Sequence, residues 1–271
     1  MKKLFSTFCL TVAAASAFAL TPAEAEVKAT LVGIENAAEQ GKLYTALCDA
    51  LPAKHQKAFY DLSQAFAKKM DPMVWNSGKG VVDTVGKVFA TKSDFIVNSA
   101  MAKEALSTEK PAAADFANAG KLIQSIASIS LDEIKAQPNA KAFAAFLDSK
   151  VGKLPKTKNQ GSYRVTTDED GDVVVCFGSE TGIECDKCIE FEKVAGKWIP
   201  EEWEDVDDIY EAITEINQFN FNSEEGSQIK MQAIMFSSMI NGMLAPILQA
   251  KTQEEFDAAI NSILGSMGGF N

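Results

Sequence analysis

The spacing of apolar residues changes twice along this chain of 271 residues. It is helical over residues 26–154, alternates with a period of two over residues 160–203, and is helical again over residues 204–271. Helices and strands are therefore segregated along the chain, which is typical of an α+β fold. We expect an N-terminal helical array, a central three- to four-stranded antiparallel β-meander, and C-terminal helices that form one unit with the meander.

Helix boundaries carry their own signals in the first region. Apolar residues recur at three and four positions between Phe59 and Met70, and they predict a helix that begins near Pro52. Asp71-Pro72 is an N-cap followed by proline at the first helical position. Ser130-Leu131-Asp132-Glu133 is a capping box, in which the serine oxygen and the glutamate carboxylate each satisfy a free backbone N–H.

Two turn sequences predict the hairpins of the meander. Asp170-Gly171 separates two alternating segments, and both of its positions suit the positive φ of a tight hairpin turn. Ala195-Gly196-Lys197 separates the next two segments. The strands on either side of these turns are expected to pair in sequence order.

The N-terminus has the pattern of an export signal. Met1-Lys2-Lys3 is a short positive segment, residues 4–20 carry no charge, and small residues stand at Ala23 and Ala25. We expect residues 1–25 to be a signal peptide that is cleaved between Ala25 and Glu26. The protein is then periplasmic or secreted.

The charge of the chain restricts its partners. The sequence holds 26 Lys and Arg residues against 37 Asp and Glu residues, a net charge of −11, and its one arginine is Arg164. Nucleic acid requires a Lys/Arg-lined face, so we expect no nucleic-acid partner. The apolar segment 229–248 contains several polar side chains, among them Lys230 and Asn241, so we expect no transmembrane segment after signal cleavage.

A single histidine, His55, excludes several chemistries. Zinc sites with two histidines and the H-E-x-x-H metalloprotease motif need ligands that this chain lacks. A Ser-His-Asp or Cys-His nucleophile would have to use His55, which follows Lys54 near a helix start and is expected to face solvent. We therefore expect no enzyme of these classes.

Four cysteines remain after signal cleavage, and an even number in an exported chain favours two disulfides. A four-residue turn within residues 178–183 would place Cys176 opposite Cys185 and leave Cys188 for Cys48. Three pairings are possible, and the sequence does not choose between them. A redox role for the Cys185-x-x-Cys188 pair is disfavoured, because a strand rather than a helix follows it. A zinc-ribbon role is disfavoured because the chain has no second C-x-x-C motif.

Two side-chain groups invite a metal interpretation that we do not favour. Thioethers at every fourth residue of a helix could bind copper(I), but steps of four wind by about 40° each and the residues between them are apolar, so we expect core. Carboxylates at alternate positions imitate a calcium loop, but the glycine stands fourth rather than sixth, so we expect a solvated hairpin turn. The groups are Met231, Met235, Met239 and Met243, and Asp168, Asp170 and Asp172.

Five short runs stand out in the first helical region: Leu51-Pro52-Ala53, Gln56-Lys57, Phe66-Ala67, Lys69-Met70-Asp71-Pro72 and Trp75-Asn76. Together they resemble a family of uncharacterised exported bacterial proteins, a resemblance that implies no established activity. The hairpin from Phe191 to Ile199, with Gly196-Lys197-Trp198, is similar to the last strands of small cone-shaped α+β domains of the nuclear-transport-factor-like type. That resemblance implies a domain that often holds small ligands.

These observations favour a non-enzymatic binding or structural protein of the cell envelope, with no cofactor. Its partner would be an unknown envelope protein or a small ligand. The alternative is a small-ligand or metal carrier that uses the Met and Cys sulfurs or a pocket between sheet and helices near Trp198, Trp203 and Tyr210. A hydrolase built on carboxylates alone is the third hypothesis, since no spacing singles out a carboxylate pair.

Overall fold

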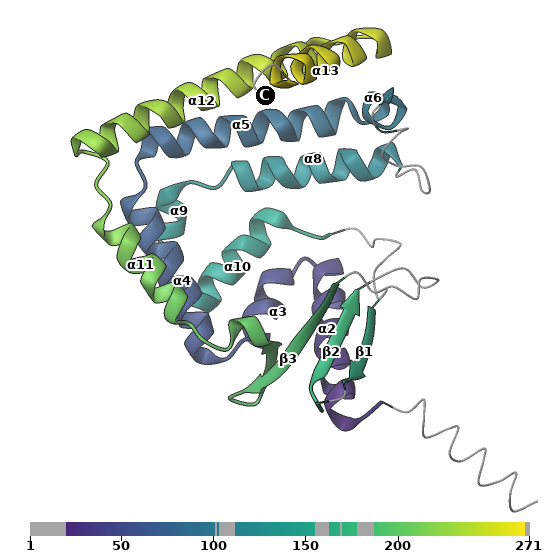
Figure 1. Cartoon of the computed structure of the whole chain (residues 1–271), viewed down its shortest axis with the longest axis vertical. Helices are drawn as coiled ribbons and strands as arrows, with labels where there is room; N and C mark the ends of the chain where they lie inside the picture. Colours follow the sequence, from purple (N-terminus) through teal and green to yellow (C-terminus); the bar gives the residue numbers. More distant parts are fainter. Residues whose placement is uncertain are drawn as a thin grey trace, which may run out of the picture.

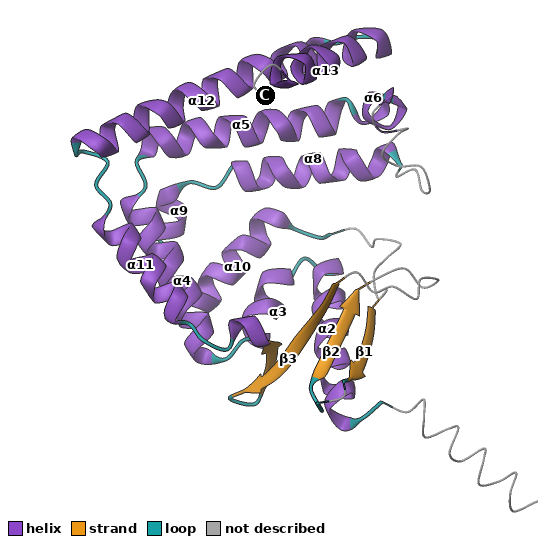
Figure 2. Ribbon diagram, in the orientation of Figure 1, coloured by secondary structure: helices purple, strands orange, loops and turns teal. Residues whose placement is uncertain are grey.

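The computed structural model describes residues 20–100, 102, 112–154, 163–168, 170–177 and 187–268. It confirms the α+β class, with N-terminal helices, a four-stranded antiparallel sheet and C-terminal helices (Figure 1, Figure 2). Most of the expected signal peptide, residues 1–19, lies outside the described residues.

The N-terminal helices run from the sheet to the opposite end of the molecule (Figure 1). α2 packs on the sheet, α3 packs between α2 and α10, α4 contacts α9, and α5 packs along α8. Their bounds are α2 Pro22–Glu39, α3 Leu43–Ala50, α4 Ala53–Lys69, α5 Pro72–Thr91, α6 Ser93–Asn98, α8 Ala113–Ala127, α9 Leu131–Lys135 and α10 Ala140–Val151.

The predicted helix starts in this region are confirmed. α4 begins one residue after Pro52, and Pro72 opens α5, where the Asp71 side chain accepts hydrogen bonds from the N–H groups of Met73 and Val74. The Ser130 capping box forms at the start of α9. Local side-chain chemistry therefore sets these boundaries.

The sheet has the order β1-β2-β3-β4, with every neighbouring pair antiparallel. Ala195 and Gly196 both have positive φ and form a two-residue turn, so Lys197 belongs to the strand that pairs with Val194. In the first hairpin Asp168 Oδ1 accepts three backbone N–H groups, and Gly171 has a φ of +97°. The strands are β1 Tyr163–Thr167, β2 Val173–Phe177, β3 Lys187–Val194 and β4 Lys197–Pro200.

The C-terminal helices return along the N-terminal ones. α11 packs on α4, and α12 packs on α5 on the side away from α8 (Figure 1). Within the described residues, α12 has the length and mean hydropathy of a helix that could cross a membrane, a criterion that helices of soluble proteins also meet. The remaining elements are the 3-10 helix η1 Glu201–Trp203 and the helices α11 Asp207–Gln218, α12 Glu224–Gln249 and α13 Gln253–Gly268.

Three separate apolar clusters hold these layers together. One joins α2 to the sheet, a second joins α4 to α9 and α10, and a third joins α5 to α12 and α13. Each cluster removes apolar surface from water at one layer boundary. Their buried members are Val27, Val165, Val173 and Val175; Ala67, Ile129, Leu131 and Ile134; and Val88, Ile247, Ala250 and Phe256.

The capping box at α9 also makes stability depend on pH. Lys150 Nζ lies 2.6 Å from Glu133 Oε1, and Ser130 donates its N–H and its hydroxyl to Glu133 Oε2, at 2.9 Å each. These contacts lower the pKa of Glu133 from 4.5 to about 2. A lowered folded-state pKa stabilises the protein above pH 4.5, and this stabilisation is lost as the pH falls from 4.5 toward 2.

We expect Glu133→Gln to lower the free energy of unfolding near pH 7, because it removes the ion pair with Lys150. The loss should be only about 1 kcal/mol, because solvent screens this partly exposed pair. The amide still accepts the capping hydrogen bond. Urea unfolding near pH 7 and near pH 3 measures the difference from wild type, which should shrink at the lower pH. Lys135→Gln, which removes an exposed ion pair with Asp132, serves as the control. A difference that does not change with pH would contradict this assignment.

Candidate functional site

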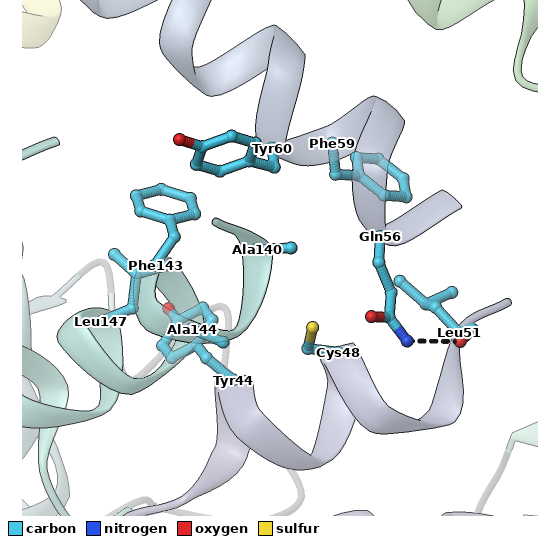
Figure 3. A pocket seen from close by; sticks show the side chains of 10 residues that line it. All are labelled: Tyr44, Cys48, Leu51, Gln56, Phe59, Tyr60, Ala140, Phe143, Ala144 and Leu147. Atoms are coloured by element: carbon cyan, nitrogen blue, oxygen red, sulfur yellow. Dashed lines mark hydrogen bonds between the residues drawn. The ribbon is translucent and has the colours of Figure 1, made fainter. Parts of the chain in front are cut away.

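An apolar cavity of about 150 Å³ lies between α3, α4 and α10 (Figure 3). Its walls are mainly aromatic and aliphatic side chains from the consecutive helices α3 and α4 and from α10, which lies far from them in the sequence. Such a lining favours apolar groups, because a bound group would leave water without losing hydrogen bonds. The lining residues are Tyr44, Cys48, Leu51, Gln56, Phe59, Tyr60, Ala140, Phe143, Ala144 and Leu147.

A buried carboxylate fixes the position of the helix that forms one wall. Asp148 on α10 accepts hydrogen bonds from the backbone N–H of Tyr44 at 2.8 Å and of Thr45 at 3.0 Å, and from the Thr45 hydroxyl at 2.6 Å. It therefore caps α3, whose own preceding residue, Lys42, makes no side-chain cap. This contact holds α3 against α10 beside the cavity.

Polar groups in the wall are turned toward backbone partners. Gln56 Nε2 donates to the carbonyl of Leu51 at 2.9 Å (Figure 3), and the Tyr60 hydroxyl donates to the carbonyl of Gln137 at 2.7 Å. These bonds satisfy the amide N–H and the phenol hydrogen before a ligand enters. The remaining surface of the cavity is consequently apolar.

Cys48 points its sulfur toward the centre of the cavity (Figure 3), and its thiol is free. Burial, and then the negative charge of Asp49, raise the pKa of the Cys48 thiol. A raised pKa keeps the sulfur protonated and apolar at neutral pH, and it makes the thiol a poor nucleophile. In this cavity Cys48 is therefore a lining residue.

His55 is fully buried, so the expectation that it faces solvent is wrong. Its Nε2 forms a short hydrogen bond with the backbone carbonyl of Trp203, which ties α4 to η1. Its Nδ1 is buried and has no hydrogen-bond partner among the residues that the structure describes. His55 is not among the residues that line the cavity, and its contact joins two elements.

The three residues expected to line a pocket lie elsewhere. Trp198 donates its Nε1–H to Glu26 Oε2 at 2.8 Å and packs against the cluster between α2 and the sheet. Trp203 is 44% exposed and contacts Phe59 edge-on, and Tyr210 is 37% exposed on α11. Trp203 therefore reaches the cavity only through Phe59, whose ring forms part of its wall.

The sequence left three disulfide pairings open, and the structure forms a bond that belongs to one of them. Cys176 is bonded to Cys188, its directly opposite residue on β3, and Cys48 is free. The arrangement that a four-residue turn would give, Cys176 with Cys185 and Cys188 with Cys48, is therefore excluded, and the described residues contain one disulfide rather than the expected two. The register places Phe177 opposite Lys187, so the connection is longer than a four-residue turn. Cys185 lies outside the described residues.

The carboxylate group considered as a calcium site is not part of a ligand cluster, and the methionine group lies on an exposed helix face. Among the described residues, no group of three or more His, Cys, Asp or Glu side chains could hold a metal ion. Asp168 binds backbone N–H groups in the hairpin turn, as expected, and Asp170 and Asp172 are exposed. The expectation that core surrounds the methionine helix is wrong, because Met231 and Met235 are 63% and 65% exposed and Met239 is 52% exposed.

No family model, no curated protein and no solved structure matches this chain. The two resemblances noted in the sequence remain predictions. The cavity itself was missed in the sequence, because its walls come from α10 and from the much earlier α3 and α4. The partners on α3 and α4 are about a hundred residues away, and no local pattern connects them.

The raised pKa of Cys48 predicts slow alkylation of the folded protein. Near pH 8 we expect iodoacetamide to label Cys48 at least about tenfold more slowly in the native chain than in the unfolded chain, because less thiolate is present and access is restricted. Mass spectrometry of peptides reads Cys48 separately from the other cysteines. Equal rates in the two states would show that the sulfur is neither buried nor shielded.

Proposed function

We propose that this chain is an exported, non-enzymatic binding protein of the bacterial envelope, and that it holds a small apolar group in the cavity between α3, α4 and α10. The observation that carries the proposal is the aromatic lining of that cavity, with the protonated Cys48 sulfur at its centre. For the alternative of a metal carrier, the described residues hold no cluster of three or more His, Cys, Asp or Glu side chains.

The size of the cavity limits what it can hold. A cavity of about 150 Å³ accommodates one benzene-sized ring, as engineered cavities of this volume do. Edge-to-face contacts with Phe59, Tyr60 and Phe143 would add to the apolar transfer free energy. The occupant is therefore a small aromatic or branched aliphatic group, either a free molecule or one side chain of an envelope protein.

A carboxylate-based hydrolase has less support. Glu190 lies beside Glu201 on the surface of the sheet, and a hydrogen bond between the two carboxyl groups raises the pKa of Glu190. Partial loss of solvent and the nearby Glu204 raise the pKa of Glu192. Glu190 and Glu192 are both exposed, and neither lines the cavity. A substrate would not be enclosed there.

A cavity-filling substitution tests the binding proposal. Ala140 lies on the cavity wall, whereas Ala145 lies on the exposed side of the same helix. We expect Ala140→Phe to weaken binding of benzene, the probe, by at least about tenfold, because the new ring occupies its space, and Ala145→Phe to leave binding unchanged. Ligand-observed NMR measures both. Absence of benzene binding to the wild type, or equal binding by the two variants, would refute the proposal.

Export is tested by the mass of the protein recovered from its envelope. We expect a chain that begins at Glu26, with a disulfide linking the peptides of Cys176 and Cys188. Cleavage there removes the first turn of α2, in which Glu24 accepts a hydrogen bond from the Thr167 hydroxyl at 2.9 Å. A cytoplasmic protein that retains Met1 would contradict the proposal.

A further inference from the structure

The outer face of α12 is apolar and uncovered. Met231, Met235 and Met239 are 63%, 65% and 52% exposed, and no described element packs on that side of the helix (Figure 1). The opposite side of α12 packs on α5, where Lys230 binds Asp71 at 2.6 Å. Among the described elements, α12 therefore packs with one side and leaves its methionine side exposed.

From Met231 onward this face carries no charge in a strongly acidic protein. The 20 residues from Met231 to Ala250 include no Asp, Glu, Lys, Arg or His, and neither does α13 after Asp257, whereas the whole chain has a net charge of −11. Two copies of this chain repel each other over most of their surface. Along residues 231–250 of the outer face of α12 they can meet without bringing like charges together, because Glu224 and Glu225 lie at the start of the helix, outside this segment.

The face has a protruding half and a hollow half. Six of its residues fall within an arc of about 100° at about 100° of rotation per residue: Met231, Met235, Ser238, Met239, Gly242 and Pro246. The methionines of the first half stand out from the surface. In the second half a groove of about 360 Å³ runs between α12 and α13, where a Cβ added at Gly242 would contact nothing within 4 Å.

We propose that this face is the dimer interface of the protein, with a second copy of the chain as its occupant. In an antiparallel pair of α12 helices the two-fold axis passes beside Ser238 and Met239. Met235 and Gly242 then lie about 5 Å from the axis on either side, and Met231 and Pro246 about 11 Å, at about 1.5 Å per residue. Each pair of methionines thus enters the groove of the other copy, as a two-fold interface requires.

A lipid surface fits this face less well. Helices that lie in the membrane interface carry Lys and Arg beside an apolar face, whereas Lys230 is engaged with Asp71 and the next lysine along the chain is Lys251. The acidic chain is also repelled by anionic lipids. A membrane does not require matched protruding and hollow halves, and a second copy does.

Sedimentation equilibrium of the mature chain tests the interface. We expect a dimer with a dissociation constant on the order of 10 µM or lower. Met235→Glu should raise this constant about 100-fold or more, because it buries two carboxylates in an apolar contact. Val32→Glu introduces the same charge on α2, far from α12, and should leave the dimer unchanged. Circular dichroism confirms that both variants fold.

Cysteine crosslinking tests the antiparallel register independently. Ser238→Cys lies beside the axis and should form a disulfide between copies under mild oxidation, whereas Met231→Cys is about 22 Å from its equivalent and should not. A monomeric wild type, a dimer that survives Met235→Glu, or crosslinking through Met231→Cys alone would overturn the proposal. Binding of a monomeric wild type to zwitterionic vesicles would assign the face to lipid instead.

Discussion

The hydrogen bonds of Asp148 connect the helices that cover the sheet to the rest of the helical layers. Its carboxylate, 9% exposed, accepts two backbone N–H groups and one hydroxyl at the start of α3. α3 in turn packs on α2, which covers the sheet. Loss of this acceptor would leave buried N–H groups unsatisfied at a helix end that has no other side-chain cap. The position of α3, which forms one wall of the cavity, therefore depends on Asp148, a residue more than a hundred positions further along the chain.

Sequence reasoning succeeded where the determinants are local. The caps at Asp71 and Ser130 and the turn at Ala195-Gly196 each place their partners within a few residues, so propensity and hydrogen-bond chemistry decide them. The change of apolar period separated the sheet from the helices for the same reason. Long-range contacts were inaccessible. The hydrogen bond between His55 and the carbonyl of Trp203 joins residues 148 positions apart, and no pattern in the spacing of apolar residues predicts it.

Two errors share one physical cause. The register of Cys176 depends on the length of the connection between β2 and β3, and the exposure of Met235 depends on which helices cover α12. The sequence of an apolar helix indicates burial in the core, whether the helix packs against its own chain or against another one. The composition therefore identified α12 as an apolar helix. Only the packing of α5 on one side shows that the apolar side chains on the other side stay exposed.

The cavity and the α12 face lie in different layers, and this separation has a functional consequence. The cavity belongs to the α3, α4 and α10 layer near the sheet, whereas α12 forms the outer edge of the opposite end (Figure 1). They belong to different apolar clusters, with α5 between α8 and α12. A dimer formed through α12 would leave both cavities away from the interface between the copies. Self-association and uptake of an apolar group are thus compatible in one molecule, and neither needs a change in the other.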